Sequence, residues 1–455
     1  AGRDTVDGVN NVFLGGLAAY DGDNGDNNVF VGYAAGQNNA ASNNTAVGKS
    51  SLAANTTGTD NVAVGANALD ANTTGDRNTS IGYLSLSANT TADNNTALGY
   101  AALNVNTTGE DNTGLGSGAL VSNTTGASNT AVGKGALNAS TTSNSNTAVG
   151  FDALNDNTTG ANNTAIGAGT LDKNTTGIQN TALGSAALDA NTTGDLNVAI
   201  GYHSLGSNVS TGANTAVGGY ALYVNEAANN TAMGYQSLYS NTSGTSNVAV
   251  GRESLNQNTS ADNNTAVGYR ALFLSTTGAN NTAVGRECLQ ANTTGASNTA
   301  LGSTALDANT TGSFNTALGQ AAMSANTTAS SITAVGYAAL LTNTTGAGNT
   351  AVGKRALASN TTGSNNVAVG TDALENHTTG SDNIAIGKNV ANALTTGNTN
   401  VAIGGQAMNT NTVGDRNVAI GYSALETYNP ASNEDAYNVA VGFAALEATT
   451  TGKNN

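Results

Sequence analysis

Few side chains of this chain have the chemistry that catalysis needs, and they do not gather in the sequence. The chain has only two histidines, His203 and His377, and one cysteine, Cys288. A nucleophile needs a base within hydrogen-bond reach, and the base needs a third group that orients it. No such set can be built from residues so far apart, and no phosphate-loop, zinc-protease or dinucleotide-binding motif occurs. We therefore expect no enzyme activity, and we expect Cys288 to be a small filler and not a reactive thiol.

One acidic stretch has the ligand types of a cation site. In "YDGDNGDNN" three carboxylates, Asp21, Asp23 and Asp26, alternate with Gly and Asn. Carboxylate and amide oxygens are ligands that Ca²⁺ prefers, but the Glu that closes an EF-hand loop is missing. A calcium site is one interpretation of this stretch, and a solvated turn is the favoured one. We expect no other cofactor.

The pattern Asn-x-Thr/Ser recurs sixteen times at one spacing, for example at Asn55, Asn72, Asn191 and Asn360. This pattern is the acceptor signal for N-glycosylation. Asn-Thr-Thr is also good turn chemistry, because Asn tolerates corner conformations and hydrogen-bonds nearby backbone. So regular a recurrence favours the structural interpretation, although glycosylation stays open.

The composition excludes several classes of partner. Of 455 residues only 9% are charged, and the net charge is −16. Nucleic-acid binding needs clustered Lys and Arg on the protein, and anionic membrane surfaces attract the same residues. No apolar stretch approaches the length of a transmembrane helix. The first residues, "AGRDTVDG", have neither the charged nor the apolar region of a signal peptide. We therefore expect neither nucleic-acid binding nor membrane insertion.

An internal repeat of 17 residues organises almost the whole chain. Copies that align on "NTAVG" begin at Asn11 and continue to Asn438, 26 in all, with two copies one residue short. With the first Asn as position 1, the consensus is Asn-Thr/Val-Ala-aliphatic-Gly-x-x-Ala/Ser-Leu-x-x-Asn-Thr-Thr-Gly-x-x. Position 5 is Gly in every copy. Such a fixed period is typical of repeat architectures, in which each unit buries its apolar face only against its neighbours.

The repeat is too short for a helix pair and fits one coil of a β-solenoid. Short β-type segments alternate with fixed glycines, which supply the tight corners. We therefore predict an all-β parallel β-solenoid, or β-roll, of about 26 coils of 17 residues. It divides into atypical capping coils over residues 1–43, regular coils over 44–416, and C-terminal coils over 417–455. A surface loop at 426–437, which contains the only proline, interrupts the last region.

Stacked coils place identical residues above one another at the strand spacing of about 4.8 Å. Asn side chains stacked in this way form amide ladders, as in cross-β assemblies. We expect a structural ladder from position 1 and from the glycine of position 5. Representative members are Asn129, Gly133, Asn146, Gly150, Asn264 and Gly268.

Side chains alternate across a strand, so one set of strand positions faces the coil interior and the other faces outward. If positions 2 and 4 point inward, the nearly constant Ala of position 3 points outward. Such a stripe predicts a contact surface between chains, represented by Ala131, Ala148, Ala266 and Ala283. The alternative is that Ala faces inward and that position 4, which is always aliphatic, faces outward.

The five-residue core of the repeat, as in "NTAVG" at Asn129, "NVAIG" at Asn197 and "NIAIG" at Asn383, resembles the head repeat of trimeric autotransporter adhesins. Copies with an "AL…NTTG" half resemble repeats of trimeric phage and bacterial tail-fibre or surface-fibre proteins. The resemblance implies a left-handed β-roll that packs as a homotrimer. The 17-residue repeat is longer than the adhesin-head repeat, and from the sequence we expect no coiled-coil stalk, membrane anchor or chaperone domain in this chain.

Together these features predict a structural and adhesive fibre that is extracellular, on a cell surface or on a virion or appendage. A rigid repeat rod would support surface attachment, with a surface receptor or glycan as partner. Alternatives are a subunit of an end-to-end extracellular filament and a tail fibre of a phage or injection system. A minor alternative is an ice-binding solenoid, in which regular threonine ranks order water.

Overall fold

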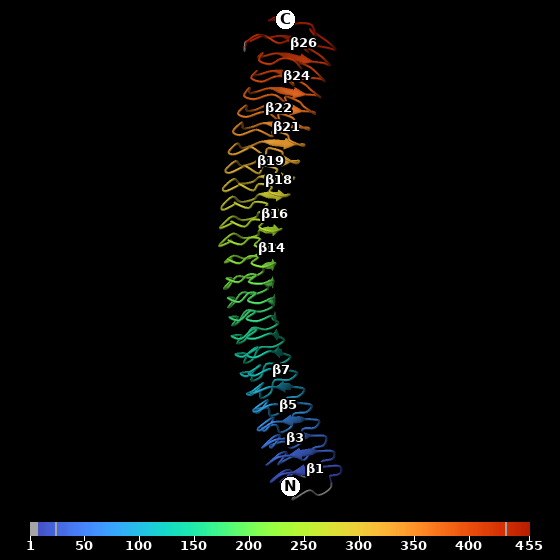
Figure 1. Cartoon of the computed structure of the whole chain (residues 1–455), viewed down its shortest axis with the longest axis vertical. Coiled ribbons are helices and arrows are strands. Elements are labelled where there is room, and N and C mark those ends of the chain that lie inside the picture. The colour runs from blue at the N-terminus through green and yellow to red at the C-terminus, as the bar shows by residue number, and fades with distance from the viewer. Residues whose placement is uncertain (1–7, 23–24, 433–434) are drawn as a thin grey trace. The chain divides into compact units, whose positions relative to one another are not determined.

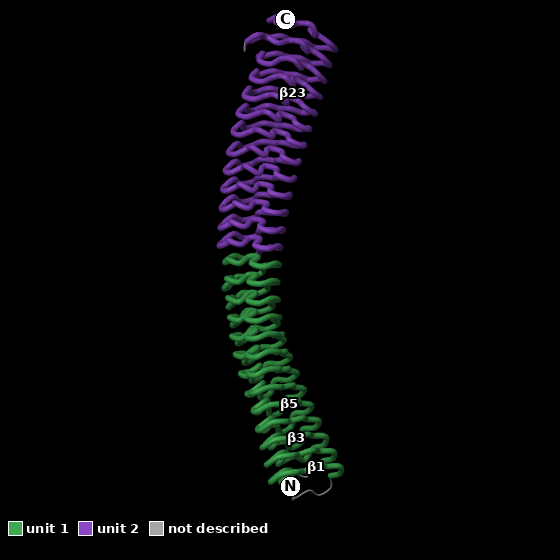
Figure 2. The backbone as a smooth tube through the Cα atoms, in the orientation of Figure 1, with its two compact units in different colours: residues 1–228 green, residues 229–455 purple. Residues whose placement is uncertain are grey.

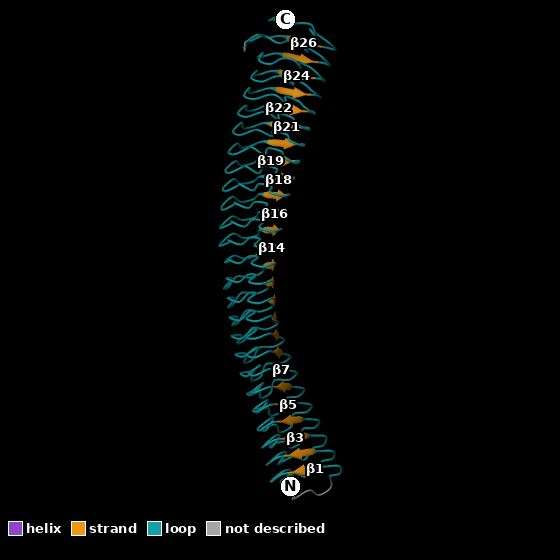
Figure 3. Cartoon of the chain, viewed as in Figure 1, coloured by secondary structure: helices purple, strands orange, loops and turns teal. Residues whose placement is uncertain are grey.

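The chain forms two compact units, residues 1–228 and residues 229–455 (Figure 2). The computed structural model describes residues 8–22, 25–432 and 435–455. Across these residues every regular element is a strand of three residues, and turns join one strand to the next (Figure 3). The second of the two 16-residue copies, which begins at Asn214, contains the division between the units.

The first unit contains thirteen strands, one for each repeat copy (Figure 1). Their bounds are β1 Val12–Leu14, β2 Val29–Val31, β3 Thr45–Val47, β4 Val62–Val64, β5 Thr79–Ile81, β6 Thr96–Leu98, β7 Thr113–Leu115, β8 Thr130–Val132, β9 Thr147–Val149, β10 Thr164–Ile166, β11 Thr181–Leu183, β12 Val198–Ile200 and β13 Thr215–Val217.

The second unit also contains thirteen strands. Their bounds are β14 Thr231–Met233, β15 Val248–Val250, β16 Thr265–Val267, β17 Thr282–Val284, β18 Thr299–Leu301, β19 Thr316–Leu318, β20 Thr333–Val335, β21 Thr350–Val352, β22 Val367–Val369, β23 Ile384–Ile386, β24 Val401–Ile403, β25 Val418–Ile420 and β26 Val439–Val441.

Within each unit every strand pairs in parallel with the strand of the next copy, and equal repeat positions face each other. Ala131 in β8 pairs with Ala148 in β9, and Ala266 in β16 pairs with Ala283 in β17. Backbone hydrogen bonds continue around the turns, as from Leu52 N to Ala68 O at 3.0 Å. The predicted parallel β-solenoid, with one coil per repeat, is therefore confirmed.

The turns depend on left-handed backbone at three repeat positions that are seldom Gly. Ser50, Leu52 and Asp60, at positions 7, 9 and 17 of one copy, have φ of 56°, 51° and 58°. This conformation costs a residue other than Gly on the order of 1–3 kcal/mol, so the surrounding coil has to impose it. The hydrogen bonds to neighbouring coils and the burial of position 9 are what hold these turns.

The interior of each coil is narrow and holds both apolar and amide side chains. The side chains that point inward come from positions 1, 3, 8, 9 and 12. In one coil they are Asn44, Ala46, Ser51, Leu52 and Asn55, all without exposed surface. The core therefore consists of Ala and Leu between two rows of Asn.

The predicted outward orientation of the alanine row is wrong. Ala131, Ala148, Ala266 and Ala283 are fully buried within their own coils. The physical reason is volume, because position 3 faces the leucine of position 9 across the narrow interior. In the copy where Phe30 replaces this alanine, position 9 is Gly36 in place of leucine. A Cβ on Gly36 would lie 2.6 Å from the Phe30 ring, so the glycine leaves the space that the phenylalanine fills.

The insertion in the last region leaves the strand register unchanged. Val418 in β25 still pairs with Val439 in β26, although the step is four residues longer. Within the described part of the predicted loop at 426–437, Tyr428 is buried in the coil, whereas Asp435 and Tyr437 are exposed and contact Arg416. The insertion is therefore partly core and partly surface.

Candidate binding surfaces

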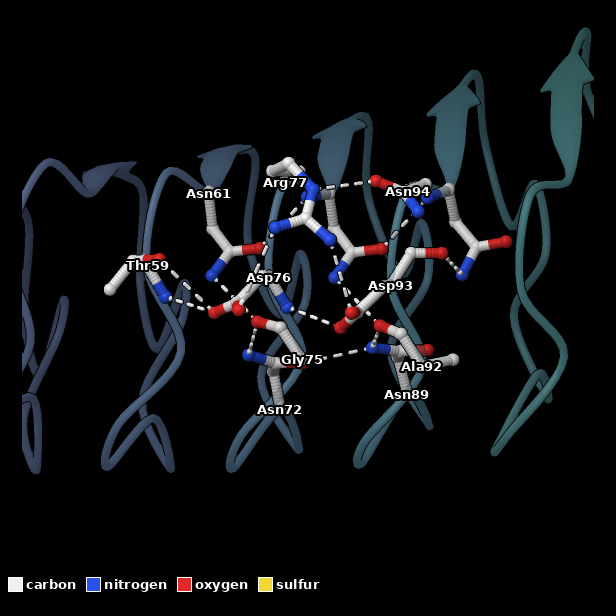
Figure 4. A network of polar contacts seen from close by, with 12 residues as sticks. Thr59, Asn61, Asn72, Gly75, Asp76, Arg77, Asn89, Ala92, Asp93 and Asn94 are labelled. Atoms are coloured by element: carbon white, nitrogen blue, oxygen red, sulfur yellow. Dashed lines mark hydrogen bonds and ion pairs between the residues drawn. The ribbon is translucent and has the colours of Figure 1, made fainter.

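The asparagine of position 1 bonds its own copy through the amide nitrogen and the next copy through the amide oxygen. Asn61 Nδ2 donates to the carbonyl oxygen of Gly75, at position 15 of the same copy, at 2.9 Å (Figure 4). Asn61 Oδ1 accepts from the backbone N of Asn78 in the next copy at 2.9 Å. The row therefore satisfies buried backbone groups that the strands leave unpaired. This use of the amide differs from the predicted side-chain ladder, although some members also contact one another.

The ladder in which side-chain amides bond one another lies at position 12. Asn89 Nδ2 donates to Asn72 Oδ1 at 2.8 Å and also to the carbonyl of Ala92 at 3.0 Å (Figure 4). Asn72 repeats the arrangement with the carbonyl of Gly75 at 3.0 Å. Each amide thus closes its own turn and bonds the coil before it.

The representative ladder residues lie in these files. Asn146 N donates to Asn129 Oδ1 at 3.0 Å, and Asn264 Nδ2 donates to the carbonyl of Gly278 at 3.0 Å. The glycines also stack, since a Cβ on Gly133, Gly150 or Gly268 would lie 2.2, 2.3 or 2.4 Å from the carbonyl oxygen of the glycine in the next coil.

Acidic and polar residues at position 16 form another row that the sequence analysis missed. Asp76 Oδ1 accepts from Thr59 N at 2.7 Å, and Asp93 Oδ1 accepts from Asp76 N at 2.8 Å (Figure 4). Arg77 pairs with Asp93 at 3.2 Å. Many of the acidic side chains are therefore structural acceptors, and they do not form a free anionic surface.

The possible glycosylation sites have no exposed acceptor nitrogen. Asn55, Asn72, Asn191 and Asn360 are all fully buried members of the position-12 ladder. A glycan on Nδ2 would remove a hydrogen bond of the ladder and would have no exit from the coil. The structure supports the turn-and-ladder interpretation and leaves no place for glycans at these four residues.

The acidic stretch near the N-terminus is only partly described. Asp23 lies outside the described residues. Asp21 accepts a hydrogen bond from Gln37 at 3.0 Å, and Asp26 accepts one from the backbone of Val9 at 2.9 Å. Over residues 8–22, 25–432 and 435–455 there is no group of three or more His, Cys, Asp and Glu residues that could hold a metal. The calcium site stays a prediction.

The histidines and the cysteine are separated in the structure. His203 lies in the first unit against the Tyr202 ring, with centroids 4.3 Å apart, whereas His377 is buried in the second unit. Cys288 is buried, donates to the carbonyl of Ala300 at 3.2 Å, and has its pKa raised to about 12 by burial. Such a thiol is not a nucleophile at neutral pH.

The outward face of the strands carries the larger side chains. Position 2 is Thr, Val or Ile, and position 4 is always aliphatic. Leu183 and Leu301 at position 4 are 44% and 48% exposed. We call this face the strand face. Within each unit it consists of a row of aliphatic side chains at position 4 beside a row at position 2 that is mostly threonine.

A second exposed row lies at position 6, directly after the invariant glycine. Its 26 members include eight of the 14 tyrosines, two phenylalanines and six of the 13 Lys and Arg residues, with no Asp or Glu. Counting residue types at each repeat position would have found this row. The aromatic members with half or more of their surface exposed are Tyr33, Tyr83, Tyr100, Phe151, Tyr202, Tyr337, Tyr422 and Phe443.

Four lysines of this position-6 row form no ion pair with any described residue: Lys49, Lys134, Lys354 and Lys388. The arginines of the row, Arg252 and Arg286, do pair with Glu253 and Glu287. In a chain of net charge −16, four lysines of one row without a carboxylate partner among the described residues indicate a place where an anionic group can bind.

None of the described residues belongs to a helix that could span a lipid bilayer. No protein-family model matches the chain, and a search of curated proteins finds no match to it. The resemblance to adhesin heads and tail fibres therefore stays a prediction from the repeat motif.

Proposed function

We propose that this protein is a structural and adhesive fibre module that works outside the cell, on a cell surface or on an appendage. In this proposal the chain associates with copies of itself through the strand face, and the exposed rows contact a surface receptor or glycan. The chain acts by geometry and not by catalysis. Contacts repeated from coil to coil bind weakly one by one and strongly together.

The observation that carries the proposal is the strand face. Monomeric soluble proteins rarely expose apolar patches larger than a few hundred Å². Here aliphatic side chains such as Leu98, Leu115 and Ile166, each 39% exposed, recur at position 4 within one unit. A second copy packed on this face would remove the methyl groups from water, which supports a homotrimer or a filament as the working form.

The internal bonding also suits a fibre. Asn and Thr side chains bond one coil to the next, as when Thr56 Oγ1 donates to the carbonyl of Thr73 at 2.8 Å. Few backbone groups of such a coil are free to open locally, and local opening is what proteases need. We expect slow proteolysis of the native protein.

The native mass of the particle tests the proposal. Sedimentation of the full chain is expected to give three times 44.6 kDa for a trimer, or larger ordered particles for a filament. A monodisperse particle of 44.6 kDa across the concentration range would contradict self-association. Helical order in electron micrographs would favour the filament, and discrete rods on a capsid or baseplate would favour the tail fibre.

Ice binding is a second candidate, which the outward threonines favour. Position 2 is Thr in seven consecutive copies from Thr79 to Thr181, beside the aliphatic file of position 4. These hydroxyls lie on the strand face, unlike that of Thr56, which is bonded to the next coil. Because the same face serves self-association in the main proposal, a monomer with thermal hysteresis would support ice binding, and a trimer without hysteresis would exclude it.

A further inference from the structure

One segment of the position-6 row contains a pocket. Lys388, Gly405 and Tyr422 are consecutive members of the row, and Gly405 leaves a gap between the other two. With Asn389 and Gln406 they line a pocket of about 240 Å³. Drug-sized ligands occupy about 300–1,000 Å³, so this pocket suits a single small ring.

The walls of the pocket have distinct chemistry. The Tyr422 ring covers Gly405, with Cδ2 3.3 Å from the position of a Gly405 Cβ. Its other neighbour along the row is Phe443, which stacks on it at 5.8 Å, so one face of Tyr422 is directed toward the gap. Lys388 forms no ion pair among the described residues, and Tyr422 OH donates to Gln406 Oε1 at 2.8 Å, which fixes the ring.

The same order of side chains occurs in the first unit. Lys49, Ala66 and Tyr83 are consecutive members of the row, and Tyr100 stacks on Tyr83 at 5.9 Å. Each unit therefore contains one series of unpaired lysine, small residue, tyrosine and stacked aromatic ring. We name these the Lys388 slot and the Lys49 slot.

We infer that each slot binds one carboxylated sugar ring of an acidic polysaccharide. Lysine and tyrosine of a slot are two coils apart, about 10 Å, which leaves room for one ring in contact with the aromatic face. The ammonium group pairs with the sugar carboxylate, and the amides of Gln406 and Asn389 hydrogen-bond its hydroxyls. This inference rests on the proposed adhesive function and names its ligand.

A polyphosphate ligand fits the slots less well. Nucleic acids carry a phosphate on every nucleotide and need many cations along the strand. Here ten aromatic residues but only four unpaired lysines lie in the whole row. Sparse cations beside ring faces suit a polymer in which apolar ring faces matter as much as charge.

Titration of the full chain with tetragalacturonate, followed by calorimetry, tests the inference. We expect two binding sites per chain and much weaker binding of the neutral galactose tetramer. Gly405→Tyr and Ala66→Tyr each fill one slot, and each variant should lose one of the two sites. Tyrosine occupies position 6 in eight copies and Gly405 has no left-handed φ, so both variants should fold.

Two further variants make the test specific. Ser185→Tyr adds a ring to the same row outside the slots and should leave both sites intact. Lys49→Gln with Lys388→Gln should weaken tetragalacturonate binding about tenfold, because a charge-assisted hydrogen bond is lost from each slot. It should leave any binding of the neutral tetramer unchanged.

Absence of saturable binding at about 10 mM ligand would overturn the inference, since a site with a dissociation constant of about 1 mM would be about nine-tenths occupied at that concentration. Equal binding of the neutral tetramer, or unchanged stoichiometry after both slots are filled, would also overturn it. Displacement of tetragalacturonate by a single-stranded oligonucleotide would overturn it as well, because the slots would then bind a polyphosphate. A trimer that fails to bind would refute the slots alone, and a monomer that binds would refute the proposed assembly alone.

Discussion

The buried amides need a specific neighbour in the next coil. At position 12 the Oδ1 of one Asn accepts from the amide of the following Asn. Where the next member is Ser140, Ser275 or His377, the preceding oxygen has no partner among the described residues. The three oxygens concerned are those of Asn123, Asn258 and Asn360. A buried acceptor without a partner costs about 1–3 kcal/mol, so these substitutions weaken the ladder.

His377 should make folding sensitive to mild acid. Its ring is buried, and Nε2 lies 2.7 Å from the carbonyl of Gly380. Burial lowers the pKa of His377 from its usual value of 6.5, and the hydrogen bond to Gly380 offsets this only in part. Because the folded pKa is the lower one, the unfolded chain takes up the proton first as the pH falls.

The stability that His377 provides is therefore present above pH 6.5 and falls between pH 6.5 and the folded pKa. His377→Asn should remove this dependence and supply a donor to Asn360 Oδ1, stabilising the second unit by about 1 kcal/mol. Urea denaturation of both proteins at pH 7.5 and pH 5 measures the effect. An equal loss of stability in the two proteins on acidification would contradict it.

The glycine of position 5 should be irreplaceable. Gly150 has a φ of 139°, and its Cβ, if present, would lie 2.3 Å from the carbonyl oxygen of Gly167. Gly150→Ala should therefore destabilise the neighbouring coils by at least about 2 kcal/mol. Hydrogen exchange of peptides covering residues 146–170 measures the loss of protection.

Gly169→Ala, in the next coil, is the matched control. Position 7 is already alanine at Ala101, Ala186 and Ala338, and a Cβ on Gly169 would have no atom within 4 Å. Its φ of 60° is close to the left-handed values of those alanines, so its effect should stay within about 1 kcal/mol. If both substitutions had the same effect, the stacking of glycines would not explain why position 5 never varies.

At the scale of the strand, the sequence predicted the element but not its orientation. Period, register and the Gly corners follow from the repeat, because only equal positions stack in a parallel coil. Alternation alone does not say which set of strand positions faces inward. One feature of the sequence did indicate the orientation. In a single copy position 3 is the large Phe30 and position 9 is Gly36, and a gain of volume at one position with a loss at the other indicates that both side chains face the interior of the coil.

The candidate surfaces were less predictable than the fold. The Asn-Thr-Thr pattern gave the turn but could not show that the amide of Asn55 is buried while the exposed Thr56 bonds to the next coil. The position-6 row is invisible to a consensus because its residues vary. To recognise it as a binding surface, one must know which side chains are exposed and which lysines have no carboxylate partner. Both follow only from the three-dimensional structure.

The orientation of the strand has a direct test. Ala148→Leu places a larger side chain in the narrow coil and should destabilise it by about 1–3 kcal/mol through overpacking. Val149→Leu, one residue later on the strand face, should change the free energy of unfolding by less than about 0.5 kcal/mol. Urea denaturation of the two variants measures the difference. If Val149→Leu were the more destabilising of the two, the alanine row would face outward and the valine inward.

At the scale of the whole molecule, the proposed assembly depends on the strand face and not on the position-6 row. Leu183 is exposed on this face, and Ser185, two residues later, is exposed in the row. Leu183→Lys should lower the native mass toward 44.6 kDa, because like charges packed against one another cost several kcal/mol.

Ser185→Lys is the control for this charge, since lysine is common at position 6. It should leave the native mass unchanged. Analytical ultracentrifugation of the two variants beside the unchanged protein measures both effects. If Leu183→Lys leaves an oligomer intact, that oligomer uses a surface other than the strand face.

Disulfide trapping tests the stacking of one repeat on the next most directly. Val132 and Val149 are register partners on adjacent strands, about 4.8 Å apart, whereas Val132 and Ile166 are two coils apart. Cysteines can be bridged only when their Cα atoms lie within about 7 Å. Val132→Cys with Val149→Cys should therefore form an intrachain disulfide on mild oxidation, found by peptide mapping, and Val132→Cys with Ile166→Cys should not. Equal trapping of both pairs, or of the second pair alone, would contradict a coil of seventeen residues.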